Sequence, residues 1–275
     1  MSVTGTRLRR RVLQTTAVAG AVYLALCGAG RLGYRVLLYP APPDPPFVPP
    51  AGAQLLSLHG DDGKLVVAAR FPATREDART LVLFHGNGET LGGRVPLAED
   101  LVARGLGVVL TEYRGYGLAA ASGPPDEAGL YRDASAILDA LEREGVGPSR
   151  LALMGISLGT GVAAEMAARG RAASLILVSP YTSITAMAQG TAPFLPASWI
   201  CPDRFDTLAK APGIRLPTLV IHGDADEVVP FAMGRAVAAA VPGATLKVVH
   251  GGHHNDLFIR SRAELEDAIV EQARR

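Results

Sequence analysis

The stretch that decides the fold is Leu151-Ala152-Leu153-Met154-Gly155-Ile156-Ser157-Leu158-Gly159. Its first four residues form an apolar run typical of a strand buried on both faces of a sheet, and a helical stretch follows from Leu158 to Arg169. A serine on such a sharp strand-to-helix turn has the context of a nucleophile elbow, in which the flanking glycines relieve crowding between strand and helix. The helix N-terminus also presents free N–H groups to developing negative charge. We therefore predict that Ser157 is a catalytic nucleophile.

Short apolar runs and helical stretches alternate on both sides of this turn. Such alternation predicts right-handed crossovers and an α/β fold whose mostly parallel central sheet carries helices on both faces. In such a sheet the binding crevice lies outside the carboxyl ends of the strands, so we expect the chemistry there. The predicted strands are Gln54–Gly60, Lys64–Phe71, Thr80–Phe84, Gly107–Leu110, Leu151–Met154, Ser174–Val178, Thr218–Ile221 and Thr245–Val249. The other predicted helices are Leu97–Arg104, Glu127–Glu144, Ala232–Ala240 and Asp256–Ala273.

The last two predicted strands each lead into a loop that offers catalytic side chains. A serine nucleophile needs a histidine base and an acid that orients it, and the chain order Ser, Asp, His suits these loops. The first loop offers two aspartates for the acid, and the second offers three histidines for the base. Spacing alone leaves open the choice between Asp224 and Asp226, and among His250, His253 and His254.

Two backbone N–H groups are candidates for an oxyanion hole. One belongs to Leu158, directly after the serine, and the other to Asn87 in the segment His85-Gly86-Asn87-Gly88, which follows an earlier strand. We interpret His85 and His222 as structural histidines.

Composition limits the classes of partner and cofactor. The chain has 275 residues, 48% hydrophobic and 19% charged, which suits one globular domain with a sizeable core. Lys and Arg number 27 against 26 Asp and Glu, so no basic excess points to nucleic acid. Neither of the two cysteines, Cys27 and Cys201, has metal-ligand spacing. We expect no metal and no organic cofactor.

The N-terminal residues 1–39 predict a basic segment followed by a membrane anchor. No charge interrupts Val12–Gly30, a length close to the ~20 residues that cross a bilayer as a helix. Four arginines precede this run and two follow it, which predicts a single-pass protein with a cytoplasmic N-terminus and an extracytoplasmic catalytic domain. A cleaved signal peptide, which would yield a secreted protein, is the alternative.

A proline-rich linker, residues 40–52, separates this segment from the predicted catalytic domain, residues 53–275. Seven of the eleven positions in Pro40–Pro50 are proline, which favours a stiff extended spacer. Within the domain, the apolar segment 181–212 is either a small lid that shapes an acyl pocket or a plain packed connection.

Several strings together resemble the α/β-hydrolase superfamily, and within it the Bem46-like and ABHD13/ABHD17-like serine hydrolases. The resemblance runs from about Leu55 to the C-terminus. It implies that the acid is Asp226, the aspartate three residues after His222-Gly223. It implies that the base is His254, the histidine directly before Asn255-Asp256. It also favours a membrane segment. The matching strings are His85–Gly88, Tyr113–Gly117, Gly155–Gly159, Ser179–Ser183, His222-Gly223 with Asp226 and Val229-Pro230, and His254–Asp256.

The chain departs from this family where Leu118–Ala121 intervene before Ser122-Gly123-Pro124. We expect that loop near the site, where it would alter selectivity. The residues and the resemblance predict a serine hydrolase that cleaves carboxylic esters or thioesters (EC 3.1 rather than 3.4), with a small molecule or an acyl compound as substrate. A serine peptidase or amidase of the same fold, or a non-catalytic membrane-tethered binding protein, are the alternatives.

Overall fold

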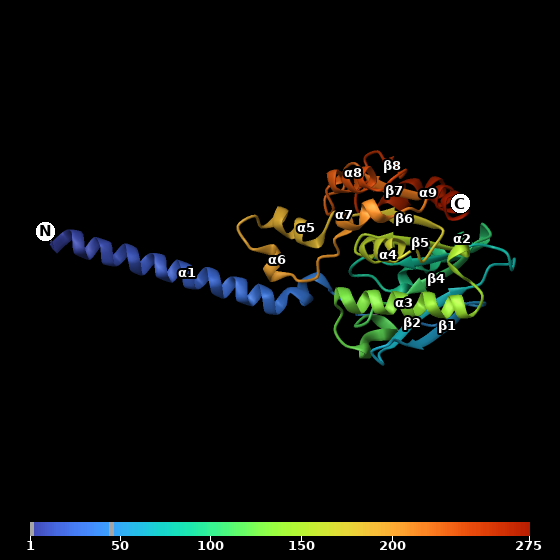
Figure 1. Ribbon diagram of the computed structural model, residues 1–275, viewed down its shortest axis with the longest axis horizontal. Coiled ribbons are helices and arrows are strands. Elements are labelled where there is room, and N and C mark those ends of the chain that lie inside the picture. Colours follow the sequence, from blue (N-terminus) through green and yellow to red (C-terminus); the bar gives the residue numbers. More distant parts are fainter. Residues whose placement is uncertain (1–2, 44–46) are drawn as a thin grey trace.

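The computed structural model describes residues 3–43 and 47–275 and shows one α/β domain with a long helix extending from it (Figure 1). The strands are β1 (Gln54–His59), β2 (Leu65–Phe71), β3 (Thr80–Phe84), β4 (Gly107–Thr111), β5 (Leu151–Ile156), β6 (Ser174–Val178), β7 (Thr218–Gly223) and β8 (Thr245–Val249). The helices are α1 (Val3–Leu38), α2 (Val95–Ala103), α3 (Glu127–Arg143), α4 (Gly159–Ala168), α5 (Ile184–Thr191), α6 (Ala197–Ile200), α7 (Thr207–Lys210), α8 (Phe231–Ala240) and α9 (Leu257–Ala273). Short 3-10 turns are η1 (Leu91–Arg94), η2 (Gly117–Ser122), η3 (Pro148–Arg150) and η4 (Ala211–Gly213).

The eight strands form one sheet in the order β1-β2-β4-β3-β5-β6-β7-β8. The two β2 pairings, with β1 and with β4, are antiparallel, and all other pairings are parallel. Every residue of the central strands β3, β5 and β6 is buried, as continuous apolar runs covered on both faces require. The predicted α/β-hydrolase fold with a mostly parallel sheet is confirmed.

Helices cover both faces of the sheet and so create two hydrophobic cores. One core lies under α3 and α4 and includes Val82, Leu153 and Leu175. The other lies under α2 and α9 and includes Leu83 and Ile176 from the opposite sides of the same strands. Alternate residues of one strand thus enter different cores, as the two-residue period of a strand dictates.

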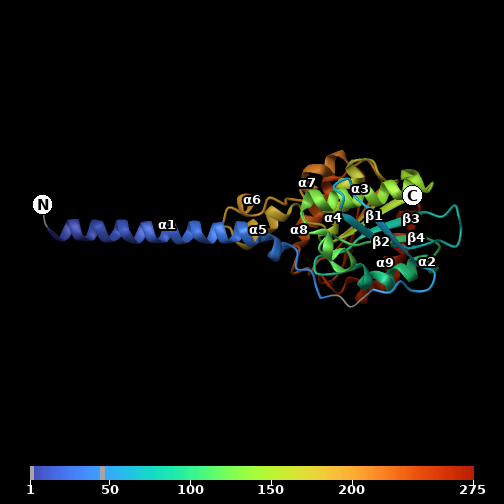
Figure 2. The same ribbon diagram turned by 90° about the horizontal axis from the view of Figure 1, so that it is seen from below.

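Helix α1 is one uninterrupted helix of 36 residues, longer than the predicted apolar run, and its C-terminal part contacts the domain (Figure 2). The guanidinium of Arg35 pairs with Asp126 at 3.1 Å, and the Tyr39 hydroxyl donates to buried Asp203 at 2.8 Å. In the described part of the linker, the Phe47 side chain packs against the core below α2. Pro45 and Pro46 lie outside the described residues.

The residues Leu118–Ala121 form part of η2, which packs against β2: Ala119 is buried, and the Ser122 hydroxyl donates to the Leu65 carbonyl at 2.6 Å. None of them lines the cavity at the candidate site, but Tyr116, directly before η2, donates to Asn87 on the wall of that cavity at 3.0 Å. An effect of this loop on selectivity stays a prediction.

Candidate active site

Ser157 lies on a strained turn between β5 and α4. Its φ of 49° is in the left-handed region, which a non-glycine residue rarely adopts. The backbones meet so closely that a Cβ at Gly155 would overlap the carbonyl group of Gly159, and a Cβ at Gly159 would overlap the carbonyl of Phe84. Glycine is therefore required at both positions, and this explains the spacing in the sequence.

The structure brings Ser157, His254 and Asp226 together at the carboxyl ends of three strands. The Ser157 Oγ lies 3.0 Å from Nε2 of His254. The other ring nitrogen, Nδ1, lies 2.8 Å from Oδ2 and 3.1 Å from Oδ1 of Asp226. Since Asp226 only accepts, Nδ1 carries the hydrogen and Nε2 accepts from the serine hydroxyl.

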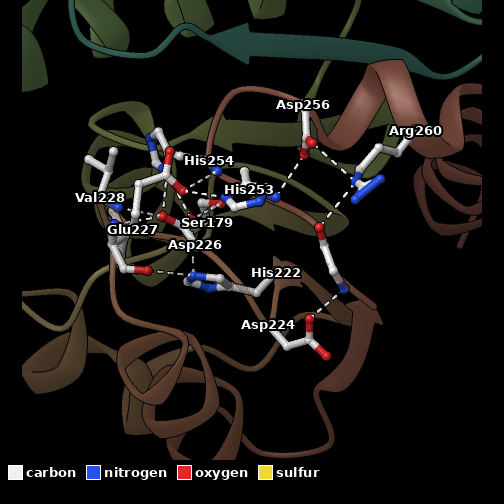
Figure 3. Close-up of polar contacts among 12 residues, drawn as sticks. Ser179, His222, Asp224, Asp226, Glu227, Val228, His253, His254, Asp256 and Arg260 are labelled. Atoms are coloured by element: carbon white, nitrogen blue, oxygen red, sulfur yellow. Dashed lines mark hydrogen bonds and ion pairs between the residues drawn. The ribbon is translucent and has the colours of Figure 1, made fainter.

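The competing aspartate, Asp224, and the other two histidines have different partners; Figure 3 shows Asp224 and His253 among them. Asp224 accepts from the Gly251 N–H at 2.6 Å and contacts Nδ1 of His250 at 2.8 Å; these bonds lower its pKa. His253 pairs with Glu227 at 3.0 Å on the protein surface. The geometry therefore singles out Asp226 and His254, the two residues that the resemblance implies.

The Asp226 carboxylate is surrounded by donors and fully buried. It accepts from the backbone N–H groups of Val228 and Val229 at 2.9 and 2.8 Å, and from the Ser179 hydroxyl at 2.9 Å. The ring of His222 approaches it at 3.3 Å. Burial alone would raise the pKa of Asp226, but hydrogen bonds from His222, His254 and the Val229 backbone outweigh it and hold the pKa well below the usual range.

Ser179 and His222 are contacts of the acid that sequence reasoning missed. Ser179 follows β6 and has, like Ser157, a φ of 49°. The sequence feature that could have pointed to Ser179 is its position directly after a predicted strand, at the sheet edge where the site was expected. His222 is fully buried, as expected of a structural histidine, but the sequence did not reveal that its ring faces Asp226.

The two predicted oxyanion donors lie on segments that flank Ser157. Asn87 is held by its side chain, because its amide nitrogen donates to the Leu38 carbonyl at 2.6 Å and its oxygen accepts from the Tyr116 hydroxyl at 3.0 Å. Within residues 3–43 and 47–275, no hydrogen bond uses the backbone N–H of Asn87 or of Leu158. His85 is buried between the Gly86 carbonyl and Glu112 and does not contact Ser157.

A cavity of about 470 Å³ opens beside Ser157 and His254. Its wall is apolar over much of its surface, and Glu89 and Arg94 contribute a bidentate ion pair in which Arg94 Nε lies 2.8 Å from Glu89 Oε2. No residue of 181–212 lines it. The apolar lining consists of Ile156, Val178, Val228, Leu257, Phe258 and Ile259. Among the described residues, no group of three or more His, Cys, Asp or Glu side chains is placed to hold a metal ion.

Comparison with known proteins shows the superfamily of the chain. The family model described as "Serine aminopeptidase, S33" matches residues 75–205. The uncharacterized protein Rv2307c of Mycobacterium tuberculosis is 34% identical over 241 residues, which are 86% of this chain and 85% of that protein. The alpha/beta hydrolase domain-containing protein aho-3 of Caenorhabditis elegans is 34% identical over 198 residues, which are 71% of this chain. The chain belongs to the α/β-hydrolase superfamily.

Within this superfamily the named relatives support the ABHD17-like group. Alpha/beta hydrolase domain-containing protein 17C of Mus musculus is 36% identical over 181 residues, or 65% of this chain. The chain spans only 56% of aho-3 and 55% of the mouse protein. Among solved structures, the Pyrococcus furiosus esterase Pf2001 shares the α/β-hydrolase fold with a TM-score of 0.70 at 17% identity, over 85% of this chain and 98% of that one.

Proposed function

We propose that this α/β hydrolase cleaves carboxylic esters or thioesters through an acyl-enzyme on Ser157. The observation that carries the proposal is the continuous hydrogen-bond chain from Ser157 through His254 to Asp226. A hydroxyl becomes a nucleophile when an adjacent base can take its proton, and the base needs a third group that fixes its tautomer. Side chains that the fold holds in place supply both this base and this third group.

The reaction proceeds in two halves. The Ser157 Oγ attacks the substrate carbonyl while His254 Nε2 takes its proton, and the N–H groups of Asn87 and Leu158 stabilise the oxyanion. The intermediate collapses, its bond to the alcohol or thiol breaks, and His254 protonates that leaving group. Water then gives a proton to His254 and attacks the acyl-enzyme. When this second intermediate collapses, its bond to Ser157 Oγ breaks, His254 returns the proton to Oγ, and the carboxylic acid leaves.

The cavity lining favours an acyl group over a peptide N-terminus. An aminopeptidase must pair the substrate ammonium with an acid. Glu89, the carboxylate outside the triad that lines this cavity, is already held by Arg94 at both oxygens. Six apolar side chains on the wall instead suit a hydrocarbon chain. The matched family name nevertheless makes amide cleavage the reaction to test beside ester cleavage.

We also propose that this hydrolase is a membrane protein. In this proposal α1 is a retained anchor, and the catalytic domain is extracytoplasmic. A 30-residue part of α1, Arg9–Leu38, is long and apolar enough to cross a bilayer, and only 6% of its apolar window is buried. Its C-terminal part belongs to the folded domain, since Cys27 and Tyr34 are buried. Cleavage within α1 would remove such contacts, which favours retention over a signal peptide.

An acyl-chain series of p-nitrophenyl esters, acyl thioesters and aminoacyl amides tests the chemistry. The full chain is measured beside Ser157→Ala and beside Ser149→Ala, an exposed serine remote from the triad. We expect hydrolysis of esters and thioesters by wild type and by Ser149→Ala, and a loss of roughly 10⁴-fold or more in Ser157→Ala. Equal rates in all three proteins would refute the mechanism, and faster amide than ester cleavage would favour the peptidase.

A further inference from the structure

The connection between β6 and α7 leaves the domain and lies along α1. Figures 1 and 2 show α5 and α6 beside the C-terminal part of α1 in both views. The Tyr23 hydroxyl donates to the Phe194 carbonyl at 3.0 Å. Further along, a Cβ at Gly30 would lie 3.2 Å from the Ile200 side chain. The connection therefore follows α1 over seven residues, or about 10 Å of helix.

This connection has the composition of a membrane segment rather than of a water-exposed loop. The sequence carries no Asp, Glu, Lys, Arg or His from Ser179 to Pro202. In the part of the connection beside α1, two large side chains point outward: Phe194 is 72% exposed and Trp199 is 55% exposed. An exposed Phe and Trp on an uncharged segment mark an interaction site, and Trp is enriched where a protein meets the membrane interface.

The depth of α1 in a bilayer fixes the depth of the connection. No charged residue occurs in α1 between Arg11 and Arg31, so Arg31 marks the boundary with the lipid headgroups. Tyr23 precedes Arg31 by eight residues and lies about 12 Å deeper along the helix. Because Tyr23 is bonded to Phe194, that residue must lie at a similar depth. If α1 crosses the hydrocarbon layer as an anchor, the part of the connection around Phe194 therefore lies in that layer as well.

Most of the N–H groups of the tip, residues 189–197, are hydrogen-bonded internally, which a layer without water favours; among the described residues, the Phe194 N–H has no such bond. The N–H groups of Leu195 and Ala197 bond to carbonyls within the tip, and the Gln189 amide donates to the Pro193 carbonyl at 2.7 Å. Two of the residues, Pro193 and Pro196, have no N–H to satisfy.

We propose that residues 184–202 insert beside α1 into the outer leaflet of the bilayer as a second membrane element. The partner is the lipid hydrocarbon and headgroup layer itself. The inference rests on the proposed membrane location of α1 and is independent of the chemistry at Ser157. Two attachments, α1 and the segment 184–202, fix the orientation of the domain. The site then lies close to the membrane surface, since the Leu38 carbonyl at the end of α1 accepts from Asn87.

Trp199, the one tryptophan in the sequence, reports on this insertion directly. The full chain is reconstituted into phosphatidylcholine vesicles, and its tryptophan emission is measured with iodide in the water or with lipids that carry a doxyl quencher at carbon 5 of the acyl chain. This shallow position suits Trp199, because its neighbour Ile200 lies beside Gly30, close to the boundary at Arg31. We expect blue-shifted emission that doxyl lipids quench and iodide does not. Quenching by iodide alone, or blue-shifted emission that neither quencher reduces, would overturn the inference.

Two sets of variants distinguish a failure of the proposed insertion of residues 184–202 from a failure of the proposed anchor α1. The double variant Leu24→Trp, Trp199→Phe places the reporter on an exposed position of α1. If doxyl lipids quench that variant but not Trp199, the anchor stands and the insertion is wrong; if they quench neither, both fail. Phe194→Asp is expected to reduce the doxyl quenching of Trp199, because a carboxylate opposes insertion of the tip, whereas Phe194→Leu keeps it. Equal quenching in Phe194→Asp and Phe194→Leu would contradict the placement of the tip in lipid.

Discussion

Gly234→Ala tests whether His222 holds the catalytic acid. Gly234 lies in α8 against the buried ring of His222. A Cβ at this position would overlap Nδ1 and lie 2.9 Å from Cε1 and from Cγ. That nitrogen has no hydrogen-bond partner among the described residues, so the polar contacts of the ring lie on its other side. There Nε2 lies 3.0 Å from the Val229 carbonyl and 3.3 Å from Asp226.

The expected loss of folding free energy in Gly234→Ala is the sum of two destabilising contributions and one stabilising contribution. To reach an ordinary contact distance of 3.4 Å from the added Cβ, Nδ1 must move by about 1.4 Å, which displaces Nε2 from its present positions beside the Val229 carbonyl and the Asp226 carboxylate. Overpacking costs about 1–3 kcal/mol, and a lost hydrogen bond to a charged group costs about 1.5–3 kcal/mol. The helix propensity of alanine returns about 1 kcal/mol. The net loss of about 3 kcal/mol lowers the Tm by roughly 6–12 °C in a domain of this size.

Circular dichroism of the full chain in detergent measures the Tm, and hydrolysis of a short-chain ester measures kcat/KM. We expect kcat/KM to fall about tenfold, because Asp226 loses one of the contacts that orient it. The matched control is Gly213→Ala, where an added Cβ meets no atom within 4 Å; it should change neither quantity. A Gly234→Ala protein as stable and as active as Gly213→Ala would refute this account of His222.

Two further predictions concern the acid. Ser179→Ala removes the hydroxyl that donates to Asp226 at 2.9 Å, so kcat should fall roughly tenfold with little change in KM, which steady-state ester kinetics measure; an unchanged kcat would contradict a positioning role. Asp226→Asn tests the lowered pKa of this carboxyl. Because folding lowers that pKa, the ionised carboxylate stabilises the fold above the unfolded value of about 3.9, and this contribution is lost as the pH falls further. The Tm difference between wild type and Asp226→Asn should therefore persist from pH 8 to pH 5 and narrow below about pH 4; narrowing already between pH 7 and pH 5 would argue against it.

The sequence predicts the core of the fold well because buried strands carry a local signal. The predicted runs Thr80–Phe84 and Ser174–Val178 coincide with the fully buried strands β3 and β6. The helix predicted over Glu127–Glu144 ends one residue earlier, at Arg143. These elements bury continuous or amphipathic apolar patterns, which periodicity detects.

Features that depend on tertiary contact escaped this reasoning. The short helices α5 and α6 have no strong periodicity, and only the structure shows that they follow α1. The contact of Ser179 with Asp226 joins residues that are 47 positions apart. The structure brings Ser157, Asp226 and His254 together, but the catalytic roles of these residues and of the Asn87 and Leu158 N–H groups stay predictions.

Mass spectrometry after reaction with a fluorophosphonate probe tests the central claim most directly. The full chain is labelled, digested and compared with Ser157→Ala and with Ser149→Ala. The account predicts one phosphonylated peptide containing Ser157, found in wild type and in Ser149→Ala and absent from Ser157→Ala. An adduct on another residue, or labelling that survives in Ser157→Ala, would contradict it.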